Sequence, residues 1–179
     1  MLEMELKFRV DDFQRVERLL ADLGIEPGKS AKESNLVLDL MGGPLRKTDT
    51  LFRLRNSGTG TLMTVKKPLP ATSLKVRYEE EAVLDCSQEK ALRLFELLGY
   101  GVVYRYEKTR RECRIDEATV CLDELWFGNF VEIEAESEEA VLHAAGLLGF
   151  DADSGIRFSY AALEKDAEQL HGPKEGKRR

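Results

Sequence analysis

The chain has 179 residues, of which 42% are hydrophobic and 34% charged, and its formal net charge is −6. This length suits one domain with a sizeable core, and the acidic surplus argues against a general nucleic-acid-binding protein, which normally carries a basic one. The three cysteines form no C-x-x-C pair and there are only two histidines, so a zinc ligand set is not expected and a reducing, cytoplasmic compartment is favoured.

The first ten residues alternate strictly between apolar and charged side chains, which predicts a β-strand over residues 1–10. A helix is expected next, because Asp11 and Asp12 can cap it and apolar residues recur at helical spacing up to Gly24, which can end it. Short alternating segments between Gly-, Pro- and Ser-rich turns then predict an antiparallel meander of four strands. These strands are expected at residues 34–40, 50–55, 61–66 and 75–84.

The second half of the chain begins with another helix, which Ser87 can cap and Gly99 can end. Three further strands are expected, followed by helices at about residues 137–148 and 159–170. The strands are expected at residues 102–115, 118–122 and 129–136. Residues 172–179 have the composition of a disordered basic tail, so the predicted single domain is residues 1–171. No apolar run approaches the roughly 20 residues that span a bilayer, so no membrane association is expected.

Long charged side chains collect on one face of the predicted strands, opposite an apolar face. In the first strand they are Glu3, Glu5 and Lys7. The commonest explanation of such a pattern is a solvated sheet face. However, the charged faces carry few Ser, Thr and Asn residues, and some strands carry one sign of charge alone, basic at Arg53 and Arg55 and acidic at Glu132 and Glu134. If the sheet closed into a barrel with helices outside, the apolar face would meet the helices and the charged face would line the lumen.

A charged lumen has consequences for what the protein binds. Each unpaired buried charge costs several kcal/mol, so the charges must compensate one another or bind ions. Carboxylates without histidine or thiolate favour Mg²⁺ or Mn²⁺, and clustered Arg and Lys favour phosphate oxygens. We therefore expect a metal ion together with a polyphosphate ligand.

Seven ordered motifs identify a family. They are Glu3-Met4-Glu5-Leu6-Lys7, Leu51-Phe52-Arg53-Leu54-Arg55, Thr64-Val65-Lys66, Arg77-Tyr78-Glu79-Glu80-Glu81, Glu107-Lys108-Thr109-Arg110, Leu122-Asp123 and Glu132-Ile133-Glu134. In this order the sequence resembles the CYTH domain, or triphosphate tunnel metalloenzyme, superfamily over nearly the whole chain. The resemblance implies an α+β fold, a closed antiparallel eight-stranded β-barrel with helices packed outside.

The resemblance also implies a role for each charged position. The implied metal ligands are Glu3, Glu5, Glu79, Glu81, Asp123, Glu132 and Glu134. The implied phosphate-binding residues are Lys7, Arg53, Arg55, Lys66, Arg77, Lys108 and Arg110. Glu5, Lys7 and Lys108 are the predicted catalytic residues, although no residue stands out as an obligatory general base.

Within the superfamily, the sequence looks most similar to the class IV adenylate cyclases, which implies conversion of ATP to cyclic AMP and pyrophosphate and suggests a homodimer. The alternative is a phosphohydrolase acting on thiamine triphosphate, inorganic tripolyphosphate or a nucleoside triphosphate. Glu134 favours that branch, and Val37-Leu38-Asp39 lacks an aromatic residue found in many members. A non-catalytic nucleotide or polyphosphate sensor is a lesser alternative.

Several other residues receive a structural interpretation. Trp126 and Phe127 are expected to form a rim or core pair, and the tyrosines at positions 104, 106 and 160 to be packing residues. His143 is expected to be structural or at the surface. The loop 68–74 and the Gly42-Gly43-Pro44 turn are expected to be connectors, with a lid over the lumen as the alternative.

Overall fold

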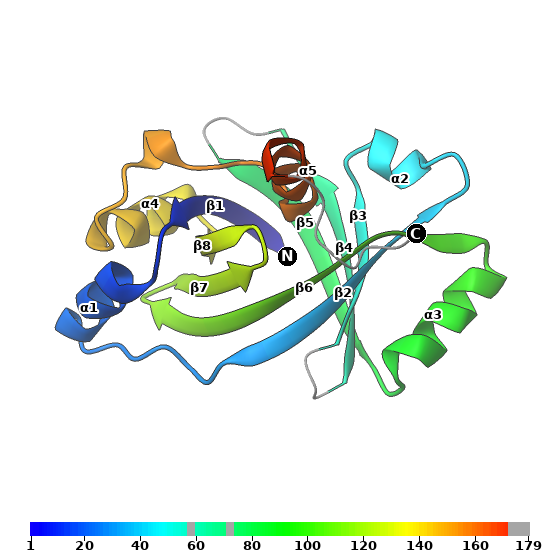
Figure 1. The fold of residues 1–179 in the computed structure, drawn as a ribbon, viewed down its shortest axis with the longest axis horizontal. Coiled ribbons are helices and arrows are strands. Elements are labelled where there is room, and N and C mark those ends of the chain that lie inside the picture. Colours follow the sequence, from blue (N-terminus) through cyan, green and yellow to red (C-terminus); the bar gives the residue numbers. More distant parts are fainter. Residues whose placement is uncertain (57–59, 71–73, 172–179) are drawn as a thin grey trace.

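Eight antiparallel strands close into a barrel in the computed structural model, which describes residues 1–56, 60–70 and 74–171, with side chains as far as Gln169 (Figure 1). The strands are β1 (Leu2–Val10), β2 (Ala31–Leu40), β3 (Leu51–Asn56), β4 (Thr61–Pro68), β5 (Lys75–Leu84), β6 (Tyr100–Ile115), β7 (Ala118–Leu125) and β8 (Gly128–Ala135). Around the barrel their order is β1-β5-β4-β3-β2-β6-β7-β8. The predicted α+β fold and barrel are confirmed.

The first strand completes the barrel. β1 lies between β5 and β8, while β2 pairs with β6 on the far side of the ring. In the β1–β8 register, Glu5 lies opposite Glu134 and Lys7 opposite Glu132. Charged residues from the two ends of the domain are thereby brought onto neighbouring strands.

Three helices cover the apolar outer face of the barrel. They are α1 (Gln14–Asp22), α3 (Gln88–Leu97) and α4 (Glu138–Leu147). In Figure 1, α1 and α4 flank one side of the barrel and α3 lies at the opposite side. The predicted cap of α3 is confirmed, since the hydroxyl of Ser87 accepts a hydrogen bond from the amide of Lys90. Over the described residues, every helix falls short of the length and apolarity that a bilayer-spanning segment requires.

Burial decides between a solvated sheet and a closed lumen. Leu6 and Phe8 of β1 are buried in a core shared with Val16 and Leu20 of α1, and each such side chain contributes roughly 1.5–3 kcal/mol. The charged side of the same strand is buried as well, with Lys7 only 2% exposed. The charged face therefore lines the barrel interior and is not a solvated surface.

Long-range pairing extends two strands beyond their predicted starts. β2 begins at Ala31 and β6 at Tyr100, because the two strands pair from Ala31 opposite Arg110 to Leu40 opposite Tyr100. The prediction placed these starts too late because local alternation carries no record of the partner strand. The change matters for the site, since it adds Glu33 to a strand.

A short helix, α2 (Pro44–Lys47), stands where only a turn was expected. Gly43 takes a left-handed φ of 66° and Pro44 occupies the first turn, where its missing N–H costs nothing. Asp39 accepts hydrogen bonds from the amides of Leu45 and Arg46. The turn is thus a fixed connector at the barrel rim.

The last helix, α5 (Tyr160–His171), is separated from α4 by a short 3₁₀ turn at Ala152–Ser154. It packs Leu163 and Ala167 against Phe127 and Phe130. Residues 57–59, residues 71–73 of the predicted connector loop 68–74 and the predicted tail (172–179) lie outside the described residues.

Candidate functional site

The barrel encloses a cavity of about 760 Å³, which lies within the range of small-molecule binding sites. Charged side chains of β1, β3, β4, β5, β6 and β8 line its interior, and residues of α2 and α5 line its rim. Every cation predicted to bind phosphate is among the lining residues.

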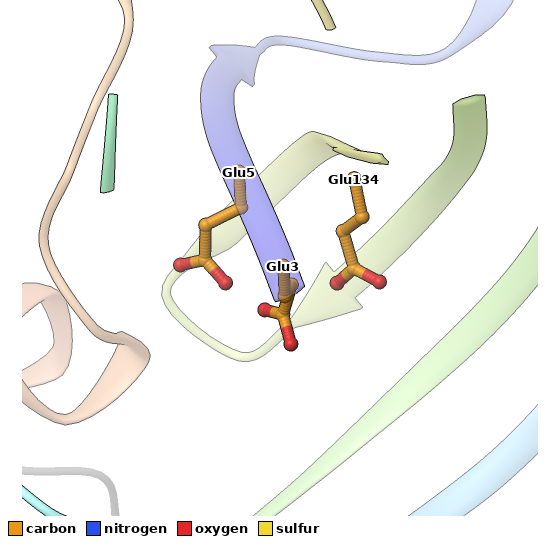
Figure 2. A group of neighbouring side chains, drawn as sticks. All are labelled: Glu3, Glu5 and Glu134. Atoms are coloured by element: carbon orange, nitrogen blue, oxygen red, sulfur yellow. The ribbon is translucent and has the colours of Figure 1, made fainter. Parts of the chain in front are cut away.

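Three carboxylates converge where β1 meets β8, and two of them, Glu5 and Glu134, line the cavity. Glu3 and Glu5 project from β1 and Glu134 from the neighbouring β8, as Figure 2 shows. Each offers one oxygen atom, and these oxygens all lie within 4.8 Å of one another. We call these residues the carboxylate cluster.

Burial opposes the ionisation of two members of the carboxylate cluster. Burial, aided by neighbouring carboxylates, raises the pKa of Glu3 to about 9 and that of Glu134 to about 7. Glu5 differs: burial would raise its pKa, but Lys7 and Lys75 lower it and keep the carboxylate ionised. One oxygen of Glu3 contacts Lys66, but its Oε1 has no hydrogen-bond partner among the described residues. Converging oxygen donors with an unpaired buried atom fit a hard divalent cation such as Mg²⁺ or Mn²⁺.

A second group of charges joins β1 to the β6–β8 wall. Lys7 contacts Glu5 at 2.6 Å and also contacts Glu132. Burial alone would lower the pKa of Lys7, but Glu132 and Glu5 raise it well above its usual value, so the ammonium stays charged.

The carboxylate of Asp123 gathers the cations of β6. It accepts two hydrogen bonds of 2.6 Å from Arg110 and one of 3.0 Å from Lys108. Arg110 also contacts Glu132. These cations are held in fixed positions with their charges facing the cavity.

The β3–β5 wall carries the remaining predicted phosphate-binding residues. Arg53 and Arg55 lie 3.7 and 3.6 Å from Glu81. Lys66 lies 3.1 Å from Glu79. Arg77 pairs at 3.0 Å with Asp49 at the rim. Cations therefore line the cavity on both sides of β1.

The structure divides the seven predicted metal ligands into two groups. Among the described residues, only the carboxylate cluster brings three of them within 4.8 Å of one another. The remaining four are each paired with basic side chains, as Glu3 and Glu5 also are, and they are Glu79, Glu81, Asp123 and Glu132. In this arrangement they orient the cations, and their role as metal ligands stays a prediction.

Sequence reasoning missed two charged residues that contact the predicted site, Lys75 and Glu33. Lys75 shares its face of β5 with Arg77 and contacts Glu5; burial and the nearby Lys7 lower its pKa to about 8. Glu33 lies 3.4 Å from Arg55. Lys75 already lay in the predicted strand, where it alternates in phase with Arg77 and could have been found. Glu33 lay just before a predicted strand start, and the observed start of β2 at Ala31 would have included it.

The interpretation of the tyrosines as packing residues was incomplete. Tyr160 is buried, but its hydroxyl donates a 2.7 Å hydrogen bond to Asp123, and its ring centroid lies 5.3 Å from the Lys7 ammonium and 5.4 Å from that of Lys108. Tyr104 and Tyr106 line the cavity. Helical periodicity could not show that Tyr160 reaches into the barrel.

Two other interpretations agree with the structure. Phe127 is buried against Phe130, and Trp126 packs on Phe127 with ring centroids 5.6 Å apart, as expected of a core pair. His143 is exposed and lies 3.5 Å from Asp116, away from the cavity.

Residues 1–152 match the sequence model of a family described as CYTH domain. A protein of Methanocaldococcus jannaschii named "Putative adenylate cyclase" is 25% identical over 91% of this chain and 98% of its own length. A Vibrio parahaemolyticus protein, also named a putative adenylate cyclase, has a similar solved structure, with a TM-score of 0.78, 21% identity and coverage of 91% of this chain and 97% of that one. A Hippeastrum protein described as a putative adenylyl cyclase with a dominant triphosphatase activity gives a TM-score of 0.59 at 18% identity, covering 92% and 95% of the two chains.

Proposed function

The chain belongs to the CYTH domain family, and on that premise we propose that it is a divalent-metal-dependent enzyme acting on triphosphates, of the class IV adenylate cyclase type. The observation that carries the proposal is the carboxylate cluster standing beside two cation-lined walls inside one cavity. A triphosphate with its metal ion satisfies both signs of charge at once. The name of the archaeal relative supports the cyclase reaction.

The arrangement of the cations supports the binding of a polyphosphate. Arg53, Arg55 and Lys66 would hold phosphate oxygens from one wall, and Lys108 and Arg110 from the other. Because each is already positioned by a carboxylate or hydroxyl, little ordering is needed when the ligand binds. Arg77 would complete the set at the rim.

Glu3, Glu5 and Glu134 would hold the metal ion, which when bound would neutralise phosphate charge and acidify the attacking hydroxyl. In the cyclase reaction, the ribose 3′-hydroxyl would lose its proton to solvent and its oxygen would form a bond to the α-phosphorus. The bond between the α-phosphorus and the oxygen that bridges it to the β-phosphate would break, releasing pyrophosphate. Lys7 and Lys108 flank the ring of Tyr160, and their ammonium groups would stabilise the negative charge that develops on the transferred and departing groups.

A triphosphate phosphohydrolase is the second candidate. It would use the same cations, with water in place of the ribose hydroxyl. The Hippeastrum neighbour shares the fold and is described as having a dominant triphosphatase activity, and Glu134 supplies the second acid of an E-x-E motif. The cytoplasmic location and the homodimer expected from the sequence stay predictions.

The deciding experiment is product analysis. The protein is incubated with ATP, thiamine triphosphate or tripolyphosphate in the presence of Mg²⁺ or Mn²⁺. Cyclic AMP with pyrophosphate would support the cyclase, and orthophosphate the phosphohydrolase. Binding without turnover would favour the sensor.

Variants connect any turnover to the site. Glu5→Gln and Glu134→Gln should abolish metal-dependent turnover, whereas Glu124→Gln should leave it unchanged, because Glu124 is exposed on β7. Full activity of both cluster variants would disprove the ligand assignment.

A further inference from the structure

The cavity changes character along β6. Among the β6 side chains that line it, Arg110 and Lys108 are followed toward the start of the strand by Tyr106 and Tyr104, with Glu112 beyond Arg110 and Val103 next to Tyr104. With a rise of about 3.3 Å per residue, this row extends roughly 20 Å from cations to aromatic rings. We call the part of the cavity wall at the aromatic end the vestibule; it consists of Val37, Leu51, Tyr104, Tyr106 and Glu164, which line the same cavity as the cations.

The vestibule adjoins the predicted phosphate site directly. The hydroxyl of Tyr106 accepts a 3.5 Å hydrogen bond from Arg53, a predicted phosphate-binding residue. In the sheet, Val37 lies opposite both Tyr104 on β6 and Arg53 on β3. A ligand whose phosphates reach Arg53 would therefore place the group attached to them against the tyrosines.

The tyrosines offer a flat apolar surface. Their rings are stacked, with centroids 5.3 Å apart and planes 21° from parallel, and both residues are half-buried. Aliphatic side chains of Val37 and Leu51 line the same compartment. An aromatic ring system is the kind of group that such a surface binds.

Glu164 of α5 adds a polar recognition element. It lines the cavity although it is only 3% exposed, and its Oε1 accepts a 2.5 Å hydrogen bond from the indole nitrogen of Trp126, which fixes its position. Its proximity to Tyr104 is evident electrostatically, since burial and Glu164 raise the pKa of that tyrosine. A carboxylate accepts several hydrogen bonds and, when ionised, donates none, so it selects a donor such as an amino group over a carbonyl.

We propose that the vestibule binds the heterocyclic part of a triphosphate ester, and that Glu164 selects a ring bearing an exocyclic amino group. This inference rests on the proposed function and narrows its substrate class, because inorganic tripolyphosphate would occupy the lumen and leave the vestibule unused. Adenine and the aminopyrimidine of thiamine share the required chemistry.

The test compares four ligands with Mg²⁺, namely ATP, ITP, thiamine triphosphate and tripolyphosphate, using the ligand dependence of the unfolding temperature to obtain apparent Kd values. Wild-type protein should bind ATP or thiamine triphosphate at least about tenfold more tightly than tripolyphosphate, and ATP more tightly than ITP. Whichever heterocycle binds more tightly identifies the source of the amino group.

Three variants of the full chain separate recognition from packing. Tyr104→Leu should weaken the heterocyclic ligands about tenfold while leaving tripolyphosphate within about twofold. Glu164→Gln should reduce or reverse the preference for ATP over ITP, because an amide can donate to the carbonyl of hypoxanthine. Asp166→Asn, an exposed position on the same helix, should change none of these values.

The possible outcomes test the vestibule assignment separately from the proposed function. The vestibule assignment is wrong if tripolyphosphate binds wild-type protein as tightly as ATP does, or if Tyr104→Leu and Glu164→Gln weaken the binding of all four ligands equally. Either result would leave the proposed triphosphate site in place. If none of the four stabilises the protein, the proposed function itself fails.

Discussion

Replacing Glu134 by glutamine should stabilise the metal-free protein at alkaline pH. In the folded chain the pKa of this carboxyl is about 7, raised from an ordinary value of 4.5 chiefly by burial and by Glu132. The folded state therefore holds the proton more tightly than the unfolded state does. The corresponding stability is fully present below pH 4.5 and is lost as the pH rises through 7.

The size of the effect follows from the pKa values. Each pKa unit corresponds to about 1.4 kcal/mol, so ionising Glu134 costs the metal-free fold about 3 kcal/mol. The glutamine side chain of the variant would resemble the protonated carboxyl in shape and would carry no charge. The Glu134→Gln variant should thus lie close to wild-type protein at about pH 5 and exceed its free energy of unfolding by about 3 kcal/mol at about pH 8.

Urea unfolding followed by circular dichroism measures this difference in EDTA at both pH values. The comparison uses the variant minus the wild type, so that other titrating groups cancel. Adding Mg²⁺ at the higher pH should reverse the order, because only the intact carboxylate cluster gains a ligand. A variant less stable than wild type at the higher pH in EDTA, or a difference that does not change between the two pH values, would refute the reasoning. Glu124→Gln serves as the surface control.

Three further substitutions probe the remaining structure. Lys7→Met leaves Glu132 without its buried partner on β1, so the free energy of unfolding in urea should fall by about 3–5 kcal/mol. The same variant should lower turnover about 100-fold in a product assay. Unchanged turnover would remove Lys7 from the catalytic residues. Tyr160→Phe keeps the ring but removes the hydrogen bond to Asp123, so the free energy of unfolding should fall by about 1–3 kcal/mol. An unchanged free energy of unfolding would mean that this hydrogen bond does not stabilise the fold. Phe52 lies beneath α3, and Phe52→Ala should lower the free energy of unfolding in urea by about 3–5 kcal/mol without altering the affinity for tripolyphosphate. A decrease of less than about 1 kcal/mol would contradict the packing of α3 on the barrel.

The barrel could be predicted because its signal is local. Alternation with period two assigns each side chain of a strand to one face, and this held for Glu3, Glu5 and Lys7 without knowledge of their neighbours. The ends of strands were less predictable, because pairing with a distant partner decides where they stop. Glu33 was missed for that reason.

The arrangement within the lumen could not be predicted, because it depends on strand order. In the sequence, Glu132 and Glu134 are equivalent acids on one strand face. In the fold, Glu132 faces Lys7 across the β1–β8 pair, whereas Glu134 faces Glu5 and joins the carboxylate cluster. Tyr160 illustrates a second limit, since the packing of a helix on a barrel is a tertiary property that helical periodicity does not encode.

The closure of the barrel by β1 and β8 has a consequence for the timing of biosynthesis. Glu3 and Glu5 leave the ribosome well before their partner Glu134, which follows only after β2 to β7 have been made. Pairings so distant in sequence form slowly and late. During translation, β1 must wait with an unpaired edge, and a metal ion could find its complete set of ligands only once the chain had grown past β8.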